Sequence, residues 1–126
     1  MDCRATLYYK AISGKGVGVF NELKIQKFDI IEYCPILIIP KNQVDIIHST
    51  VLHDYYFLWD HNRAAIALGY GSLYNHSFSP NAEYIMDYSN NRIIVQALQD
   101  ITAHEEITFN YNGDADATDA LWFQVK

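Results

Sequence analysis

The stretch LGYGSLYNHSFSPN, residues 68–81, decides how this sequence is interpreted. It is too long and too rich in polar and aromatic groups for a routine loop, and its glycines, serines and proline predict irregular backbone. Asn75 and His76 can each donate and accept hydrogen bonds. Either one alone would more often be a satisfied structural residue than a ligand. Together in one turn-rich segment they indicate a functional site.

Two further segments lie on either side of this stretch. Residues 14–20 read GKGVGVF, and residues 105–113 read EEITFNYNG. Closely spaced glycines let a backbone approach a ligand, although a plain hairpin turn is the commoner explanation for the first segment, which lacks the spacing of a dinucleotide fold. In the second, Phe109 and Tyr111 share one face of an expected strand, because side chains alternate. They form either ordinary core packing or a narrow aromatic slot that ends in a phenol hydroxyl.

The rest of the chain predicts a mostly β fold with little helix, because short β-rich runs alternate with turns. The expected strands are residues 7–9, 17–20, 30–33, 36–39, 55–59, 64–68, 82–86, 93–98 and 106–110. Pro35 is expected to end a strand, and residues 89–91 to form a hairpin turn. The best helical candidate is residues 43–53, where apolar residues recur at helical spacing.

The composition narrows the class of protein. The 126 residues suit one domain, and half of them are hydrophobic, which is enough for a core. Neither Cys3 nor Cys34 belongs to a CxxC pair, so we expect no disulfide framework or structural zinc and a reducing, intracellular setting. The histidines show no metal-ligand spacing. We see no signal peptide and no apolar run long enough to span a bilayer.

The charge is unevenly distributed. The formal net charge is −6, and between residues 64 and 125 Arg92 is the one fixed cation against eight acidic residues. A solubilising surface is the commoner explanation of such a pattern. The alternative is a surface that attracts a basic partner, such as a lysine-bearing segment. Direct binding to nucleic acid would need the opposite sign of charge.

The three segments, in this order, resemble the SET-domain protein lysine methyltransferases. The first is similar to the family's cofactor loop, a GxG followed by hydrophobic residues. The second resembles its NHS-x-x-PN signature, matched by Asn75, His76, Ser77, Pro80 and Asn81. The third resembles its E-[LI]-T-[FY]-x-Y signature, matched by Glu106, Ile107, Thr108, Phe109 and Tyr111. Residues 54–57, DYYF, are a looser match to a DYxF element. Together the matches span residues 14–113, most of the chain.

This resemblance implies a β-clip-like fold of small curved sheets with a knot-like C-terminal threading. It implies transfer of methyl from S-adenosylmethionine to lysine, with S-adenosylhomocysteine as product and no metal. Tyr111 matches the catalytic tyrosine. The expected cofactor-binding residues are Gly16, Val17, Gly18, Tyr70, Asn75 and His76. The expected substrate channel contains Tyr55, Phe109 and Trp122.

Some positions depart from the family pattern. Phe78 replaces the cysteine often found after NHS, no CxC cluster follows Tyr111, and residues 72–73 are Ser-Leu where many members have Arg-Phe. The chain therefore resembles the minimal bacterial and viral members without a zinc lid. We expect one SET domain over residues 1–126, with its core at about 5–113, and residues 114–126 closing the lysine channel. We also expect a homodimer. Phe109 stands where a tyrosine restricts the product, which predicts methylation beyond the monomethyl state.

The expected partner is a basic protein or peptide that presents a lysine, such as a histone or a histone-like, DNA-associated protein. We expect no direct nucleic-acid or membrane binding, and a location in the cytoplasm, the nucleoid or a nucleus. Two other interpretations remain open. One is a SET fold that binds basic peptides without turnover, and the other is a purely structural β domain.

Overall fold

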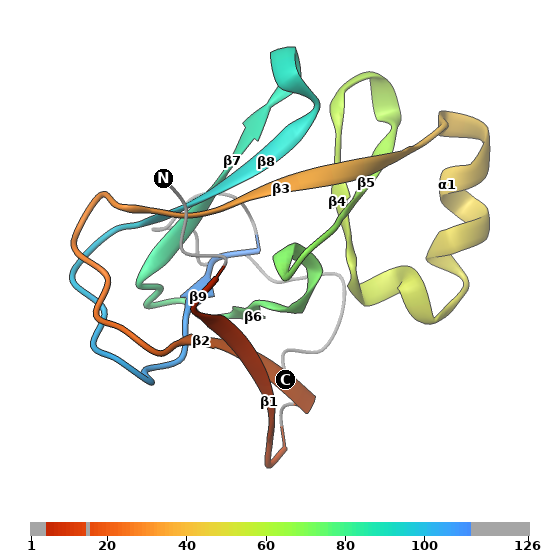
Figure 1. Ribbon diagram of the computed structural model, residues 1–126. Helices are drawn as coiled ribbons and strands as arrows, with labels where there is room; N and C mark the ends of the chain where they lie inside the picture. Colours follow the sequence, from red (N-terminus) through yellow and green to blue (C-terminus); the bar gives the residue numbers. More distant parts are fainter. Residues whose placement is uncertain (1–4, 15, 112–126) are drawn as a thin grey trace.

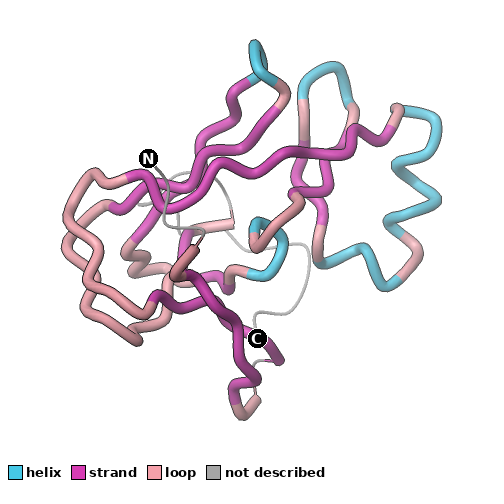
Figure 2. Tube along the Cα trace, in the orientation of Figure 1, coloured by secondary structure: helices cyan, strands magenta, loops and turns pink. Residues whose placement is uncertain are grey.

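The computed structural model describes residues 5–14 and 16–111. Figure 1 shows short strands around a long central one, and Figure 2 shows how little of the trace is helical. The strands and the α-helix are β1 (Leu7–Ile12), β2 (Gly16–Asn21), β3 (Ile30–Ile39), α1 (Lys41–His48), β4 (Tyr56–Leu58), β5 (Ala64–Ala67), β6 (Asn75–His76), β7 (Ala82–Asp87), β8 (Arg92–Ala97) and β9 (Thr108–Phe109). Short 3₁₀ helices are η1 (Val51–Asp54), η2 (Asp60–Asn62), η3 (Gly71–Leu73) and η4 (Tyr88–Asn90). The prediction of a mostly β fold with little helix is confirmed.

The largest sheet has five antiparallel strands in the order β4-β5-β3-β8-β7. Its central strand, β3, pairs first with β8 and then with β5. The predicted hairpin between β7 and β8 is confirmed, and its turn ends on Asn91 with a left-handed φ of 49°. Asparagine tolerates this backbone conformation better than most residues.

The prediction that Pro35 ends a strand was wrong. Pro35 lies inside β3, at the point where this strand leaves β8 and joins β5: Pro35 pairs with Arg92 of β8, and Ile36 pairs with Ala67 of β5. Its missing N–H therefore falls at the junction of two ladders. Its carbonyl is still used, because it accepts a hydrogen bond from the Leu68 backbone N–H at 2.8 Å.

The helix predicted over residues 43–53 is shorter than expected. The α-helix ends at His48, and η1 begins separately at Val51. Thr50 separates the two elements: its backbone is extended, and its side-chain oxygen accepts a hydrogen bond from the Leu52 N–H at 3.1 Å. A threonine that caps the next turn in this way competes with continuation of the first helix.

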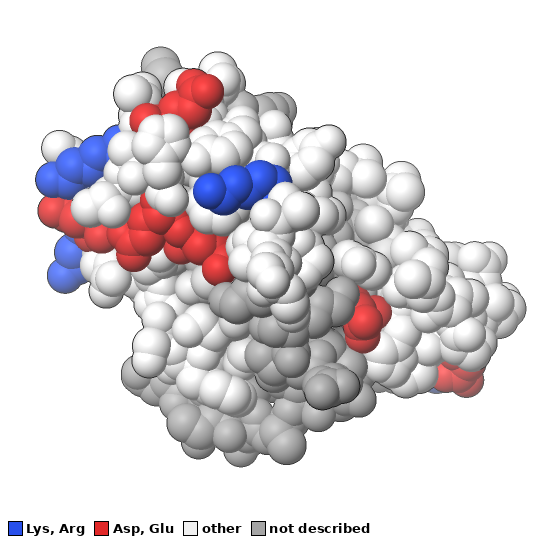
Figure 3. Space-filling view, turned by 90° about the horizontal axis from the view of Figure 1, so that it is seen from below, with Lys and Arg blue, Asp and Glu red and all other residues white. Residues whose placement is uncertain are grey.

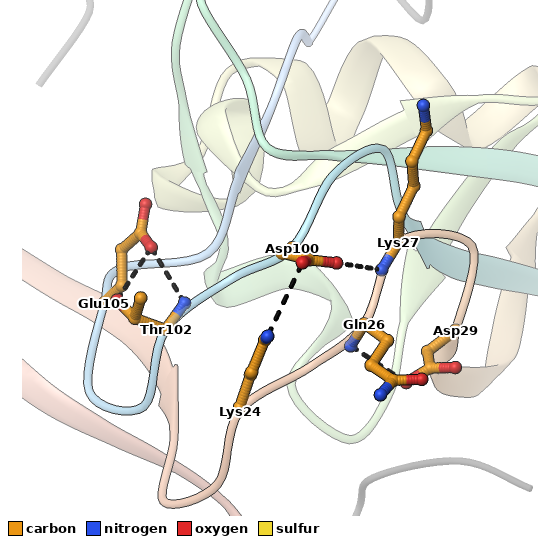
Figure 4. Close-up of polar contacts among 7 residues, drawn as sticks. All are labelled: Lys24, Gln26, Lys27, Asp29, Asp100, Thr102 and Glu105. Carbon is orange, nitrogen blue, oxygen red and sulfur yellow. Dashed lines mark hydrogen bonds and ion pairs between the residues drawn. The ribbon is translucent and has the colours of Figure 1, made fainter.

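At one end of the molecule two loops, residues 22–29 and 98–105, are joined to each other (Figure 4). Ile25 and Ile101 form a β-bridge beneath them, and both side chains are buried. On the surface, Asp100 accepts a hydrogen bond from the Lys27 backbone N–H at 2.9 Å and forms an ion pair with Lys24 at 3.5 Å. An apolar contact and exposed polar contacts thus hold these loops together.

The hydrophobic core lies between the five-stranded sheet and the short strands beside it. It is built from side chains of β1 to β3, β5 and β7 to β9 and of the connecting loops. Its larger fully buried apolar members are Val19, Ile25, Ile31, Tyr74, Ile93, Val95, Ile101, Ile107 and Phe109. Because Tyr74 and Phe109 come from the second and third motif segments, the core and the candidate site share side chains.

Candidate active site

A two-strand parallel ladder brings the second and third motif segments together. Asn75 of β6 pairs with Thr108 of β9, and His76 pairs with Phe109. The first segment joins them, because the Ile107 backbone N–H donates to the Val19 carbonyl at 2.9 Å. The order of the motifs in the sequence did not by itself specify this contact. The structure shows that the three segments meet in one place.

The Tyr111 side chain and backbone are fixed by three hydrogen bonds. Its hydroxyl donates to the Tyr74 backbone carbonyl at 2.5 Å. Its backbone N–H donates to His76 Nδ1 at 3.0 Å, and its carbonyl accepts from the Tyr84 hydroxyl at 2.8 Å. A phenol held in this way keeps its oxygen at one position.

The surroundings of Tyr111 keep its phenol protonated. Burial is the main cause that raises the pKa of Tyr111 well above its usual value. The nearby Tyr55 raises this pKa further, and so do the carboxylates of Glu106 and Asp54. The neutral hydroxyl can donate and accept hydrogen bonds, but it cannot act as a base near neutral pH. The neighbouring carboxylates favour positive charge in the site.

His76 presents a buried donor that has no protein partner among the described residues. Its Nδ1 accepts the Tyr111 N–H, so the proton of the neutral ring lies on Nε2. Burial lowers the pKa of His76, which keeps the ring neutral. Its Nε2 is buried and lacks a hydrogen bond in the part of the chain that the structure describes. Because buried donors are rarely left unpaired, we expect this N–H to meet an acceptor that lies outside the described residues.

Asn75 connects the glycine-rich segment to the third motif. Its Nδ2 donates to the Val17 carbonyl at 2.9 Å and to Glu106 Oε2 at 2.7 Å. Gly18 lies against the same carboxylate, since an added Cβ would be 2.7 Å from Glu106 Oε2. Packing in this structure therefore accounts for this glycine. Gly16 has a φ of +79° with open space around it, so a left-handed backbone favours glycine there.

Asn81, the last residue of the second motif, holds the third motif in place. Its Oδ1 accepts from the Thr108 N–H at 2.9 Å, and its Nδ2 donates to the Glu106 carbonyl at 2.8 Å. The Asn81 side chain is buried, and these two bonds pair a backbone donor and a backbone acceptor of the third motif.

The expected channel residues differ in their burial and in their contacts. Tyr55 is half-buried and lies near enough to Tyr111 to raise its pKa. Phe109 is fully buried, and its ring centroid lies 4.9 Å from that of Tyr84, 5.1 Å from that of Tyr74 and 5.9 Å from that of Tyr111. It belongs to an aromatic cluster directly beneath Tyr111. Trp122, with the whole segment 114–126, lies outside the described residues.

The described side-chain contacts of Tyr70 are with residues of β1. Its hydroxyl donates to the Leu7 carbonyl at 3.2 Å, and its ring lies 6.4 Å from that of Tyr9. These contacts hold η3 against β1. The described contacts of Tyr70 therefore support a role in packing, and its expected role in cofactor binding stays a prediction.

Comparison with known proteins identifies the fold and the family. Residues 16–112 match the SET domain family. A histone-lysine N-methyltransferase of Schizosaccharomyces pombe, specific for H3 lysine 37, is 33% identical over 122 residues, which cover 96% of this chain and 79% of that protein. A Plasmodium falciparum structure, described as a candidate histone methyltransferase, is 37% identical with a TM-score of 0.69, over 84% of this chain and 92% of the other.

The chain belongs to the SET domain family. A further solved structure, from work on product specificity of histone lysine methyltransferases, shares the fold alone at 20% identity, with a TM-score of 0.70 over 92% of this chain and 55% of the other. The resemblance given by the three motifs is thereby confirmed, and so is the class of enzyme, a protein-lysine N-methyltransferase. The knot-like threading involves residues beyond Tyr111 and stays a prediction.

Two residues that shape this SET site, Tyr74 and Glu32, were not among those predicted from the sequence. Tyr74 supplies both the carbonyl that accepts the Tyr111 hydroxyl and a ring of the aromatic cluster. Glu32 is fully buried, and its carboxylate accepts a hydrogen bond from the Tyr74 hydroxyl. A signal for Glu32 was present, because it is the one acidic residue in the ten-residue apolar strand β3.

The described residues of the SET domain contain neither a candidate metal-binding cluster nor a helix that could span a membrane. In residues 5–14 and 16–111, no group of three or more His, Cys, Asp and Glu could hold a metal ion. The His48 and His53 rings do meet, with centroids 4.2 Å apart, although their spacing fits one helix face poorly. They meet because His53 belongs to η1 rather than α1. No helix within the described ranges is long and apolar enough to cross a membrane.

Proposed function

We propose that this SET domain transfers the methyl group of S-adenosylmethionine to a lysine ε-amine of a histone or another basic protein. The observation that supports the cofactor assignment is the buried Nε2–H of His76 beside Tyr111, which has no hydrogen-bond partner among residues 5–14 and 16–111. His76, Asn75 and the backbone of residues 16–18 would hold the cofactor. When bound, it supplies an activated methyl group.

The surroundings of Tyr111 are suited to a lysine amine in its neutral form and to a cofactor that carries a positive charge. A free lysine has a pKa of about 10.4 and must lose its proton before it can attack. The aromatic surroundings of Tyr111 disfavour the ammonium form by desolvation. The neutral Tyr111 hydroxyl and the Tyr74 carbonyl offer fixed oxygens that orient the amine. We infer that alignment, rather than a strong base, supplies most of the catalysis.

The proposed substrate is a basic protein, with a histone as the first candidate. Two observations support it: the fission-yeast relative is specific for a histone H3 lysine, and this chain has a formal net charge of −6. Figure 3 shows carboxylates gathered in a band at one side of the molecule, with basic side chains beside them. A negative surface attracts cationic segments over the Debye length. A histone substrate would place the protein at chromatin.

The proposed product extends beyond monomethyl-lysine. Phe109 carries no hydroxyl, and its ring packs against Tyr74 and Tyr84 beneath Tyr111. A tyrosine at this position would add a polar group that could hold a water and reduce the room for added methyl groups. Mass spectrometry of the product should show di- or trimethyl-lysine for the wild type and a shift towards monomethyl-lysine for Phe109→Tyr. A strictly monomethyl wild-type product would contradict this part of the proposal.

The main test is incubation with radiolabelled S-adenosylmethionine and a panel of basic proteins that includes histones. Tyr111→Phe serves as the paired variant, because it keeps the ring and removes the hydroxyl that Tyr74 accepts. We expect label on lysine for the wild type and a loss of about 100-fold in the variant, the order expected when a reacting group is misplaced. Calorimetric binding of the cofactor without any transfer would instead support a binding module.

We also propose that this chain forms a homodimer. β4 and β7 are the edge strands of the five-stranded sheet, and an exposed strand edge is a ready surface for pairing. Analytical ultracentrifugation should show a dimer that dissociates on dilution. A single monomeric species at high concentration would contradict it.

A further inference from the structure

Glu32 is a fully buried acidic residue in the central strand of the sheet. A carboxylate taken out of water is costly unless donors surround it. In many cores a hydrophobic residue of similar size at such a position is neutral or stabilising. The position of Glu32 under the loop that carries the second motif therefore calls for an explanation beyond packing.

The carboxylate of Glu32 holds the loop between β5 and β6. Its Oε2 accepts from the Tyr70 backbone N–H at 2.9 Å, and its Oε1 accepts from the Tyr74 hydroxyl at 2.9 Å. Gly69 has a φ of +66°, and any Cβ there would collide with Glu32 Oε2. The loop is thus shaped around an acceptor that meets a backbone donor and a side-chain donor at the same time.

Tyr74 connects this buried carboxylate to the catalytic tyrosine. Its hydroxyl is held by Glu32 at one end, and its backbone carbonyl accepts the Tyr111 hydroxyl at the other. The ring between them packs on Phe109, with centroids 5.1 Å apart. Tyr74 is fully buried, so both of its ends are fixed inside the protein.

We propose that Glu32 and Tyr74 are positioning residues for methyl transfer. Glu32 anchors the Tyr74 ring, the anchored ring fixes the Tyr74 carbonyl, and this carbonyl sets the direction of the Tyr111 hydroxyl. The proposal rests on the proposed function, because it assigns these residues to the geometry of the same reaction. A misplacement of about 1 Å at a reacting group can reduce a rate by about 100-fold, so a small shift of this carbonyl is enough to matter.

A purely structural role for the pair predicts a different result. In that case the loss of the Tyr74 hydroxyl lowers stability, as the loss of any buried hydrogen bond does, by about 1 kcal/mol. The folded fraction would then retain its turnover number. A positioning role lowers kcat in the folded protein and leaves the KM for S-adenosylmethionine nearly unchanged.

The test compares Tyr74→Phe with Tyr56→Phe. The control removes the hydroxyl of another buried tyrosine, Tyr56 of β4, whose part-buried hydrogen bond joins it to His48 Nδ1 at 2.7 Å. We expect similar losses of thermal stability in the two variants. We expect kcat to fall at least about tenfold in Tyr74→Phe and to change less than about twofold in Tyr56→Phe. Equal turnover in both variants would overturn the proposal.

A second readout does not require enzyme activity. With tyrosine labelled at the ¹³Cζ position, the resonance that disappears in Tyr111→Phe belongs to Tyr111. We expect this resonance to move or broaden in Tyr74→Phe and to stay in place in Tyr56→Phe. Absence of any change in Tyr74→Phe would overturn the positioning role. The two proposals can also fail separately. If the wild type methylates no substrate but the Tyr111 resonance still changes in Tyr74→Phe, the proposed function fails while the effect of Tyr74 on the position of Tyr111 stands.

Glu32→Gln provides a variant of nearly the same shape. A glutamine side chain has an oxygen at only one of its two terminal positions and an NH₂ group at the other, so it cannot accept hydrogen bonds at both positions as the Glu32 carboxylate does. We expect its kcat and its Tyr111 resonance to change in the same direction as those of Tyr74→Phe. A folded Glu32→Gln protein with wild-type kcat and an unchanged resonance would remove Glu32 from the proposal.

Discussion

The loop before β6 and the loop around Asp100 are both fixed by carboxylates that accept backbone hydrogen bonds, but their surroundings differ. Glu32 accepts from the Tyr70 N–H inside the protein, whereas Asp100 accepts from the Lys27 N–H at the surface (Figure 4). Water can replace the surface contacts at little cost. It cannot replace the buried ones, because an unpaired buried group retains its desolvation penalty.

This difference suggests why the site is built from buried polar groups. Asn75, Asn81 and Glu32 are all buried, and each makes hydrogen bonds of 2.7–2.9 Å to the motif segments. Such bonds specify one arrangement, since every alternative leaves a donor or acceptor unpaired. Substitutions can test this contrast between buried and exposed polar contacts, and their expected effects on stability range from large to small.

The largest effect is expected for Asn75→Ala. The substitution removes the donor to the Val17 carbonyl and to the Glu106 carboxylate, and both of these hydrogen bonds are part-buried. We expect the free energy of unfolding to fall by about 3 kcal/mol. The matched control is Asn90→Ala, because Asn90 donates to Asp87 at 2.9 Å on an exposed turn. Urea denaturation should show a loss below about 0.5 kcal/mol for the control. Equal losses would contradict the contrast.

The next effect concerns alkaline pH. Burial raises the pKa of Tyr84 to about 12 and that of Tyr111 also above its usual value. A phenol with a raised pKa in the folded state binds its proton more tightly there than in the unfolded chain, so its contribution is complete below pH 10 and is lost as pH rises. We expect Tyr84 to account for about 2 kcal/mol lost between pH 10 and 12.

The measurement is urea denaturation at pH 8 and at pH 11.5, with Tyr84→Phe beside the wild type. The variant lacks the titrating hydroxyl and should lose less stability between the two pH values. An identical loss in the two proteins would show that the burial of Tyr84 does not cause the decline.

A smaller effect is expected for Gly18→Ala. An added Cβ would lie 2.7 Å from Glu106 Oε2 and would also collide with Ile12 Cδ1. The side chains can move aside, so we expect a loss of about 1 kcal/mol from overpacking. The moved carboxylate would also weaken its bond to Asn75. In a Glu106→Ala background the cost should fall by about half, as a double-mutant cycle measures. An unchanged cost would locate the strain at Ile12 alone.

Much of the fold and of the site could be predicted from the sequence. Most of the strands and the β7–β8 hairpin follow from local patterns and were placed within a few residues, whereas β6 lies in a stretch that was predicted to be irregular. The resemblance singled out the motif residues Asn75, His76 and Tyr111. In the structure, a hydrogen bond from the Tyr111 N–H to His76 Nδ1 joins the second motif to the third. Local patterns carry such information because each motif lies on one continuous segment.

The remainder depends on contacts between distant segments, which local patterns do not contain. Pro35 continues a strand only because β3 changes partner at that residue. Glu32 is compatible with the core only because Tyr70 and Tyr74, about forty residues later, supply its donors. The Tyr70 hydroxyl donates to the Leu7 carbonyl, 63 residues earlier in the chain, which is a contact that no local pattern contains. None of these partners could be identified without the register of the sheet.

The smallest effect is expected at the surface, for Asp100→Asn. The hydrogen bond from the Lys27 N–H lowers the pKa of the Asp100 carboxyl, and the nearby Lys24 lowers it further. A depressed pKa means that the carboxylate stabilises the fold above the unfolded value of about 3.9, and that this contribution is lost as pH falls through the folded value. We expect the wild type and the variant to differ slightly at pH 7 in low salt. The difference should shrink in high salt, because exposed charges are screened, and vanish once the pH is below the folded pKa of Asp100. A difference as large as that of Asn75→Ala would mean that this exposed loop contact matters as much as the buried ones, and the contrast between the two regions would fail.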